Sequence, residues 1–147
     1  MNDRILIVLD LESQDSFLKR ALDAARSLQK TAVALQILTS HLYYYGFKDY
    51  LAGGRAKTDF LLYIRQEVME RGRKQAAHLL DMAKALRVQL RVKTVETENR
   101  VAEIVAEAHK GYDLVIVARE PRRLFPLLHR SLAQEVERKA GCRVLEL

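Results

Sequence analysis

Two segments of this 147-residue chain place polar side chains directly after runs of apolar residues. Asp10 to Ser13 follows the apolar run 5–9. A carboxylate there could accept hydrogen bonds from the ribose or base of a ligand, or it could cap the next helix. The second segment, after the apolar run 114–117, contains Ala118, Arg119, Arg122, Arg123, Arg130 and Ser131. Its arginines lie near an expected helix start, where they could bind an anion or remain solvated surface side chains.

The chain lacks the usual phosphate-binding glycines. A phosphate cradle needs closely approaching backbone N–H groups, and neither GxGxxG nor GxxxxGK[ST] occurs in the sequence. The six glycines fall elsewhere: Gly46, Gly53 and Gly54 in a long connection, Gly72 within a helix, and Gly111 and Gly141 at helix ends. Within a helix, Gly72 is expected to be a weak point of about 1 kcal/mol relative to alanine.

Metal binding and nucleophilic catalysis are not predicted. The four histidines do not have the spacing of metal ligands, and no serine or cysteine is spaced with a histidine and an acid as a triad requires. Cys142 is the only cysteine, and we expect it to be buried rather than reactive. Because no internal disulfide can form, a reducing cytoplasm is the expected location. We therefore expect no metal and no catalytic residue.

The composition excludes several classes. Hydrophobic residues make up 49% and charged residues 30%, which disfavours a disordered chain. No apolar run is long enough for a membrane span, so no membrane association is expected. The net charge of +6 raises nucleic-acid binding as a hypothesis, but charges of both signs mix along residues 57–86, as on a solvated helix face. Nucleic acid is therefore not an expected partner.

Short apolar runs alternate with helical periodicity along the whole chain. Strands are predicted at 4–10, 31–38, 88–95, 113–118 and 142–147, and helices at 17–28, 57–86, 101–108 and 129–140. This pattern predicts one α/β domain over residues 1–147. We expect an open, mostly parallel five-stranded sheet in the order third, second, first, fourth, fifth, with helices on both faces. Ligands would bind where the winding reverses, between the first and fourth strands.

The third predicted strand alternates apolar and polar residues, which indicates a half-exposed strand at an edge of the sheet. The connection at residues 39–56 is unusually long and holds four of the six tyrosines, Tyr43, Tyr44, Tyr45 and Tyr50. Packing as a lid, contact with a partner and stacking on a nucleobase are alternative roles for it.

The order of these segments resembles the universal stress protein family. Residues 113–118 (DLVIVA) and 130–145 (RSLAQEVERKAGCRVL) are similar to the family's "DLIVMG" strand and "GSVSEKVLRHAPCPVLVV" segment. Residues 4–10 (RILIVLD) resemble the opening "KILVAVD", and 98–104 (ENRVAEI) take the place of its "G-x-P-x-x-x-I" helix start. The resemblance spans essentially the whole chain. It implies the fold, a homodimer and a stress or regulatory role.

Nucleotide-binding members of that family carry a G-x2-G-x9-G-[ST] pattern after the fourth strand. Here the glycine positions fall on Ala118, Pro121 and Arg130; only Ser131 is retained, and the loop is one residue shorter. Proline has no N–H to donate, and an arginine side chain stands where backbone must approach phosphate. ATP is therefore not expected to bind in the usual way, and no cofactor is predicted. Asp10 still matches the family's adenosine-contacting aspartate, so a remnant of the pocket is expected.

A receiver domain of a response regulator is the nearest competing fold. It requires a phosphorylatable aspartate after the third strand, where this chain has Val95 and Glu96.

Three functions remain open. The leading hypothesis is a cytoplasmic, non-enzymatic regulatory or interaction module that forms a homodimer through its last strand, with Val144 and Leu145 near the centre of the interface. The second is a protein that binds a nucleotide such as ATP or AMP, or another anion, through the arginine-lined loop, with slow ATP hydrolysis as a variant. The third is nucleic-acid binding through the basic surface.

Overall fold

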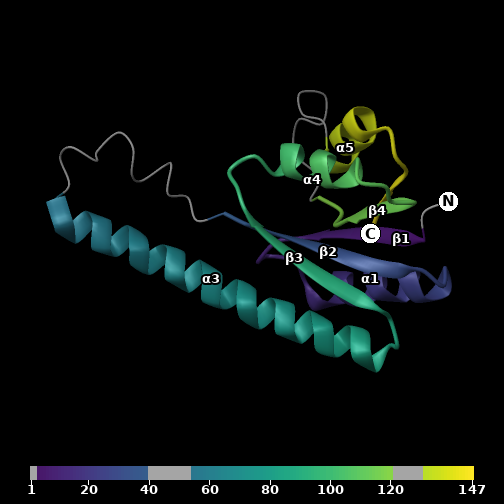
Figure 1. The fold of residues 1–147 in the computed structure, drawn as a ribbon, viewed down its shortest axis with the longest axis horizontal. Helices are drawn as coiled ribbons and strands as arrows, with labels where there is room; N and C mark the ends of the chain where they lie inside the picture. The colour runs from purple at the N-terminus through teal and green to yellow at the C-terminus, as the bar shows by residue number, and fades with distance from the viewer. Residues whose placement is uncertain (1–2, 40–53, 121–130) are drawn as a thin grey trace.

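A computed structural model describes residues 3–39, 54–120 and 131–147. All strand pairs are parallel, and the sheet order is β3-β2-β1-β4-β5, which confirms the predicted fold class (Figure 1). The strands are β1 (Arg4–Leu9), β2 (Thr31–Leu38), β3 (Leu90–Glu96), β4 (Leu114–Val117) and β5 (Val144–Glu146). The described helices are α1 (Asp15–Ser27), α3 (Gly54–Ala85), α4 (Arg100–Ala108) and α5 (Leu132–Ala140).

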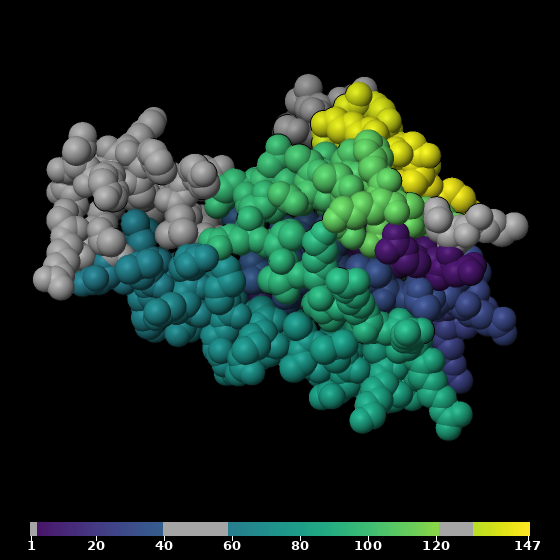
Figure 2. Space-filling view, viewed as in Figure 1, coloured from purple at the N-terminus to yellow at the C-terminus, as the bar shows by residue number. Residues whose placement is uncertain are grey.

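The helices cover both faces of the sheet, as predicted. Alternate residues of β1 point to opposite faces: Ile5 and Ile7 pack with α1 and α3, and Leu6 and Val8 pack with α4 and α5. The space-filling view shows α3 in teal on one side of the molecule and the green and yellow α4 and α5 on the other (Figure 2). Since β1 is buried on both faces, its sequence is a continuous apolar run rather than an alternating one.

The two edges of the sheet are β3 and β5. The edge position predicted for the third strand is confirmed, and its side chains are mostly half-buried or exposed. The last strand, Val144–Glu146, is shorter than the predicted 142–147. Its later start follows from the end of α5, because Gly141 ends that helix in the left-handed conformation (φ 65°). Two further residues then connect the helix end to the position where β5 pairs with β4.

The helix starts differ from the predictions in ways that capping explains. The last helix begins at Leu132 and not near 129, because Ser131 forms a capping box with Gln134. Asp10 caps no helix, so that alternative is wrong: α1 begins at Asp15 after an N-cap at Gln14.

The long helix α3 begins at Gly54, three residues before its predicted start, so Gly54 belongs to the helix and not to the long connection. Most of that connection, residues 40–53, lies outside the described residues, so the roles considered for its tyrosines remain predictions. Figure 1 shows that the amino-terminal half of α3 extends past the carboxyl ends of β2 and β3.

Gly72 also has a packing role in α3, besides the helix-weakening effect expected from its propensity. A Cβ atom at this position would lie 2.9 Å from Cδ1 of Leu38, closer than carbon atoms approach one another. The glycine therefore allows α3 to lie close to the Leu38 side chain of β2, which would have to shift to admit a Cβ atom.

None of the described helices is both long and apolar enough to cross a membrane.

Candidate functional site

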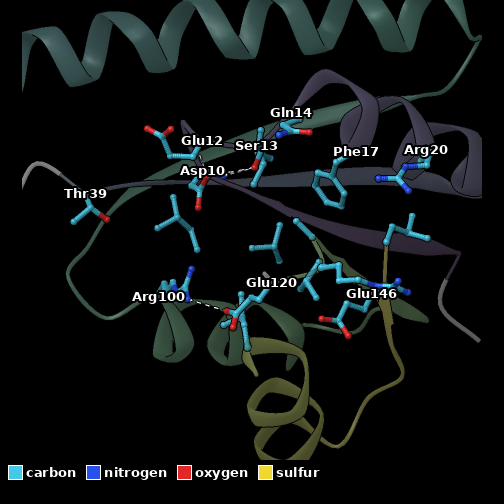
Figure 3. Close-up of a pocket in the computed structure, with 18 residues that line it drawn as sticks. Asp10, Glu12, Ser13, Gln14, Phe17, Arg20, Thr39, Arg100, Glu120 and Glu146 are labelled. Carbon is cyan, nitrogen blue, oxygen red and sulfur yellow. Dashed lines mark hydrogen bonds and ion pairs between the residues drawn. The ribbon is translucent and has the colours of Figure 1, made fainter. Parts of the chain in front are cut away.

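A cavity of about 820 Å³ lies beyond the carboxyl ends of β1 and β4. This is the point where the winding of the sheet reverses, as the sequence predicts for a ligand site. Three of the predicted site residues, Asp10, Ala118 and Arg119, line it. In Figure 3, Asp10, Glu12 and Ser13 lie on one side of the cavity, facing Arg100 and Glu120 on the other.

Asp10 is held in a tight turn at the end of β1. Its Oδ1 atom accepts hydrogen bonds from the backbone N–H of Glu12 (2.8 Å) and from Oγ of Ser13 (3.4 Å). The Asp10 N–H donates to the same Ser13 hydroxyl at 3.0 Å, and the Ser13 N–H donates to the Asp10 carbonyl at 3.2 Å. The Asp10 Oδ2 atom accepts no hydrogen bond from the described residues. The half-buried carboxylate therefore keeps one oxygen with which to accept a ligand hydroxyl or amine.

Arg100 and Glu120 form an ion pair within one wall of the cavity. Arg100 is the first residue of α4, after the Asn99 side chain caps that helix, and its Nη2 atom lies 3.1 Å from Oε1 of Glu120. The N-terminus of a helix favours an anion, and an arginine side chain there adds a positive charge that could bind it. In this protein the carboxylate of Glu120 is the anion that Arg100 already binds.

The charged residues that line the cavity are of both signs. Four are acidic and three are arginines, so their formal sum is −1 among the described residues; they are Asp10, Glu12, Glu120, Glu146, Arg20, Arg100 and Arg119. Among the described residues, a polyphosphate would meet four carboxylates against three arginines, one of which Glu120 already pairs, so the lining offers it no net positive charge.

The structure does not bring Ser131 into the cavity lining. Its Oγ accepts the N–H of Gln134 at 3.2 Å, and its own N–H donates to Oε1 of Gln134 at 3.1 Å. The hydroxyl thus helps to start α5, and the neighbouring Leu132 is the residue that reaches the cavity. Arg122, Arg123 and Arg130 lie outside the described residues, so their role at the site remains a prediction.

Sequence reasoning missed several residues of the cavity wall, among them Arg20, Thr39, Arg100 and Glu146. One signal was available for Thr39 and Arg100. Each follows the carboxyl end of a predicted strand, at 38 and 95, and parallel strands present those ends at one edge of the sheet. Arg20 gives no such signal, because it lies inside α1 and reaches the cavity only through helix packing.

The described residues offer neither a cluster of metal ligands nor an activated thiol. In residues 3–39, 54–120 and 131–147, no three His, Cys, Asp or Glu side chains are grouped to hold a metal ion. Cys142 is half-buried against the α4 and α5 layer, and this burial raises the pKa of its thiol. A raised pKa reduces the thiolate fraction on which reactivity depends.

Comparison with known proteins gives a consistent result. The family model described as "Universal stress protein family" matches residues 1–145. Among curated proteins, no relative matches the chain in sequence.

Several solved structures share the fold. A member of that family from Burkholderia pseudomallei is 22% identical, with a TM-score of 0.65 over 99% of this chain and 95% of the other. A family protein from Arabidopsis thaliana with AMP bound is 9% identical (TM-score 0.61; 98% and 90% covered). A universal stress protein in complex with cAMP is 16% identical (TM-score 0.58; 98% and 94% covered).

Proposed function

The chain belongs to the universal stress protein family, and from this premise we propose that it is a single-domain, cytoplasmic regulatory module that carries out no turnover chemistry and does not bind ATP in the usual way. The observation that carries the proposal is the charge of the cavity at the β1/β4 switch point. Four carboxylates line it, and Glu120 already neutralises the arginine at the start of α4. These groups oppose a triphosphate at the position where the loop also lacks glycine.

The module acts as a homodimer in this proposal, with β5 as the contact strand. β5 is an edge of the sheet, and Leu145 on this strand is 36% exposed. An edge strand with an exposed apolar side chain favours pairing with a second chain, and a two-fold axis would bring the two copies of Leu145 together. Val144 packs partly against the protein's own core beneath α4 and α5, so Leu145 is the side chain more available to a partner.

ATP affinity is the first test of this proposal. We expect a dissociation constant weaker than about 100 micromolar, or about 5 kcal/mol of binding free energy at most, because no glycine cradle offsets the desolvation of the phosphates. Isothermal titration calorimetry on nucleotide-free protein measures this, and adenosine titrated in parallel reports the nucleoside part alone. Low-micromolar ATP binding, or ATP retained through purification, would overturn the proposal.

A second candidate function is binding of a nucleoside, a nucleoside monophosphate or another small anion. One observation favours it: the Oδ2 atom of Asp10 lies at the cavity without a partner among the described residues. Two structural neighbours are described as holding cAMP and AMP, which are ligands with a single phosphate. A thermal-shift screen of adenosine, AMP, cyclic nucleotides and ATP distinguishes the candidates, because a ligand that binds only the folded state raises the melting temperature.

The arginine-rich loop supplies a further prediction for the second candidate. If Arg122 and Arg123 bind the anion through their side chains, then the double variant Arg122→Ala, Arg123→Ala loses the thermal stabilisation that phosphate or sulfate gives the wild type. Arg87→Ala, Arg91→Ala is the matched control. It removes the same charge from two exposed positions, one in the turn before β3 and one near the amino-terminal end of β3, so this variant should keep the thermal shift. A wild type that shows only the general salt effect, or a loop variant that keeps its shift, would show that this loop is ordinary surface.

A further inference from the structure

A chain of side-chain amides connects the interior of the sheet to the candidate cavity. Gln36 is only 1% exposed in the middle of β2, a strand that is otherwise apolar from Ala32 to Leu38. Its Nε2 atom donates to the Gly72 carbonyl at 2.7 Å and to Oε1 of Gln75 at 2.8 Å. Its Oε1 atom accepts from the Thr94 hydroxyl at 2.8 Å. Gln36 thus joins β2 to β3 and to α3.

Gln75 extends this chain to the cavity. While its Oε1 atom accepts from Gln36, its Nε2 atom donates to the main-chain carbonyl of Asp10 at 2.7 Å. The same carbonyl accepts the N–H of Ser13, which closes the Asp10 turn. One half-buried amide from the middle of α3 therefore fixes the end of β1 at the point where the Asp10 carboxylate faces the cavity.

The close approach at Gly72 makes this arrangement possible. Without a Cβ atom at that position, α3 lies near enough to β2 for the Gly72 carbonyl to reach Gln36. Apolar side chains of the same shape would hold α3 on the sheet about as well, since buried hydrogen bonds contribute little net stability when both partners can be replaced. What apolar residues would not supply is the directional bond to the Asp10 carbonyl.

We propose that Gln75 is a positioning residue for the cavity: its amide holds the Asp10 turn, and through it the Asp10 carboxylate, in one orientation. The geometry of the cavity is then coupled to the placement of α3 on the sheet. This proposal rests on the proposed ligand role of Asp10 for its functional meaning, and it concerns a residue 65 positions away from Asp10 in the chain.

Two substitutions of Gln75 separate its two hydrogen bonds. Gln75→Glu keeps an acceptor for Gln36 but has no N–H for the Asp10 carbonyl, whereas Gln75→Met removes both bonds with a side chain of similar length. Amide hydrogen exchange of ligand-free protein, measured by NMR, reports the turn through the N–H groups of Glu12 and Ser13. Both variants should speed exchange at these two amides about five- to tenfold relative to the β1 amides, as expected for the loss of one hydrogen bond.

Thr94→Val is the structural control. It removes the hydrogen bond from the Thr94 hydroxyl to Oε1 of Gln36 and keeps Gln75 with its bond to the Asp10 carbonyl, so exchange should rise in β2 and β3 more than at the turn. The proposal is overturned if Gln75→Glu leaves Glu12 and Ser13 at wild-type rates. It is also overturned if Thr94→Val, compared at equal global stability, speeds those two amides as much as the Gln75 variants do.

Adenosine binding measured by calorimetry supplies the functional readout. If the wild type binds adenosine, Gln75→Glu should weaken the affinity about five- to tenfold, and an unchanged affinity would overturn the role of Gln75 at the site. If the wild type binds neither adenosine nor AMP, the nucleoside candidate fails. The exchange measurement on ligand-free protein still decides whether Gln75 holds the turn.

Discussion

Glu107→Gln is expected to lower the free energy of unfolding at pH 7 by about 3 kcal/mol, a large part of the stability of a domain of this size. The side chain of Glu107 is only 7% exposed, on the inner side of α4. Its carboxylate accepts from Nζ of Lys93 at 2.7 Å and from the hydroxyl of Tyr112 at 2.7 Å, and Nζ of Lys110 lies 3.0 Å away. A glutamine keeps one acceptor oxygen for the lysines but loses the negative charge opposite their two ammonium groups, and the Tyr112 hydroxyl would have to accept instead of donate.

The same network predicts an acid-dependent loss of stability. Burial by itself would raise the pKa of Glu107, but the hydrogen bonds from Lys93, Tyr112 and Lys110 outweigh it and lower the pKa to about 2. Because the pKa is lower in the folded state than its ordinary value of 4.5, the stabilisation is fully present above pH 4.5. It is lost as the pH falls from there towards 2. The shift corresponds to about 3 kcal/mol, which agrees with the effect expected for the glutamine variant.

Urea unfolding between pH 7 and pH 2.5 tests both statements. The wild type should lose this part of its stability on acidification, and Glu107→Gln should lack it at every pH. Glu103→Gln is the matched control on the same helix, since no described side chain bonds to Glu103, and it should change stability by less than about 1 kcal/mol. Equal stability of the Glu107 and Glu103 variants at pH 7 would contradict the assigned role of the network.

Leu145→Asp is expected to convert the proposed dimer to a monomer at tens of micromolar. In a two-fold interface along β5 the substitution acts twice. It removes two apolar side chains, each 36% exposed in the protomer and therefore able to contribute only roughly 0.5 to 1 kcal/mol more on burial by a partner, and it places two unpaired carboxylates near each other in the interface. The dimer affinity should therefore fall at least about 100-fold. Sedimentation velocity of wild type and variant measures the change.

Leu80→Asp is the control for this experiment. Leu80 is 43% exposed on α3, the helix that packs on β2 and β3 at the other side of the sheet, so its variant should keep any dimer formed through β5. A wild type that sediments as a monomer would rule out the proposed assembly. A Leu145→Asp variant that stays dimeric would move the interface away from β5.

The sequence by itself determined the order and type of the elements. Buried central strands need apolar side chains on both faces, so the runs at β1 and β4 were continuous, whereas the alternation around Lys93 marked β3 as an edge. Gly141 could be predicted as a helix end from the sequence, because a glycine that ends a helix acts only on the conformation of the neighbouring backbone. The position of the cavity also followed from the sequence, since parallel strands fix which chain ends meet.

Only the tertiary structure decided which side chains meet across those elements. Gly72 is a helix-weakening residue by propensity, and its close approach to Leu38 depends on how α3 crosses β2. Asp10 could have capped a helix, and the turn around it shows that it does not. The bond from Gln75 to Asp10 and the ion pair between Arg100 and Glu120 join residues 65 and 20 positions apart. Local periodicity reports the spacing within one element, whereas such pairs depend on the register and crossing angle between elements, which only packing of the whole chain sets.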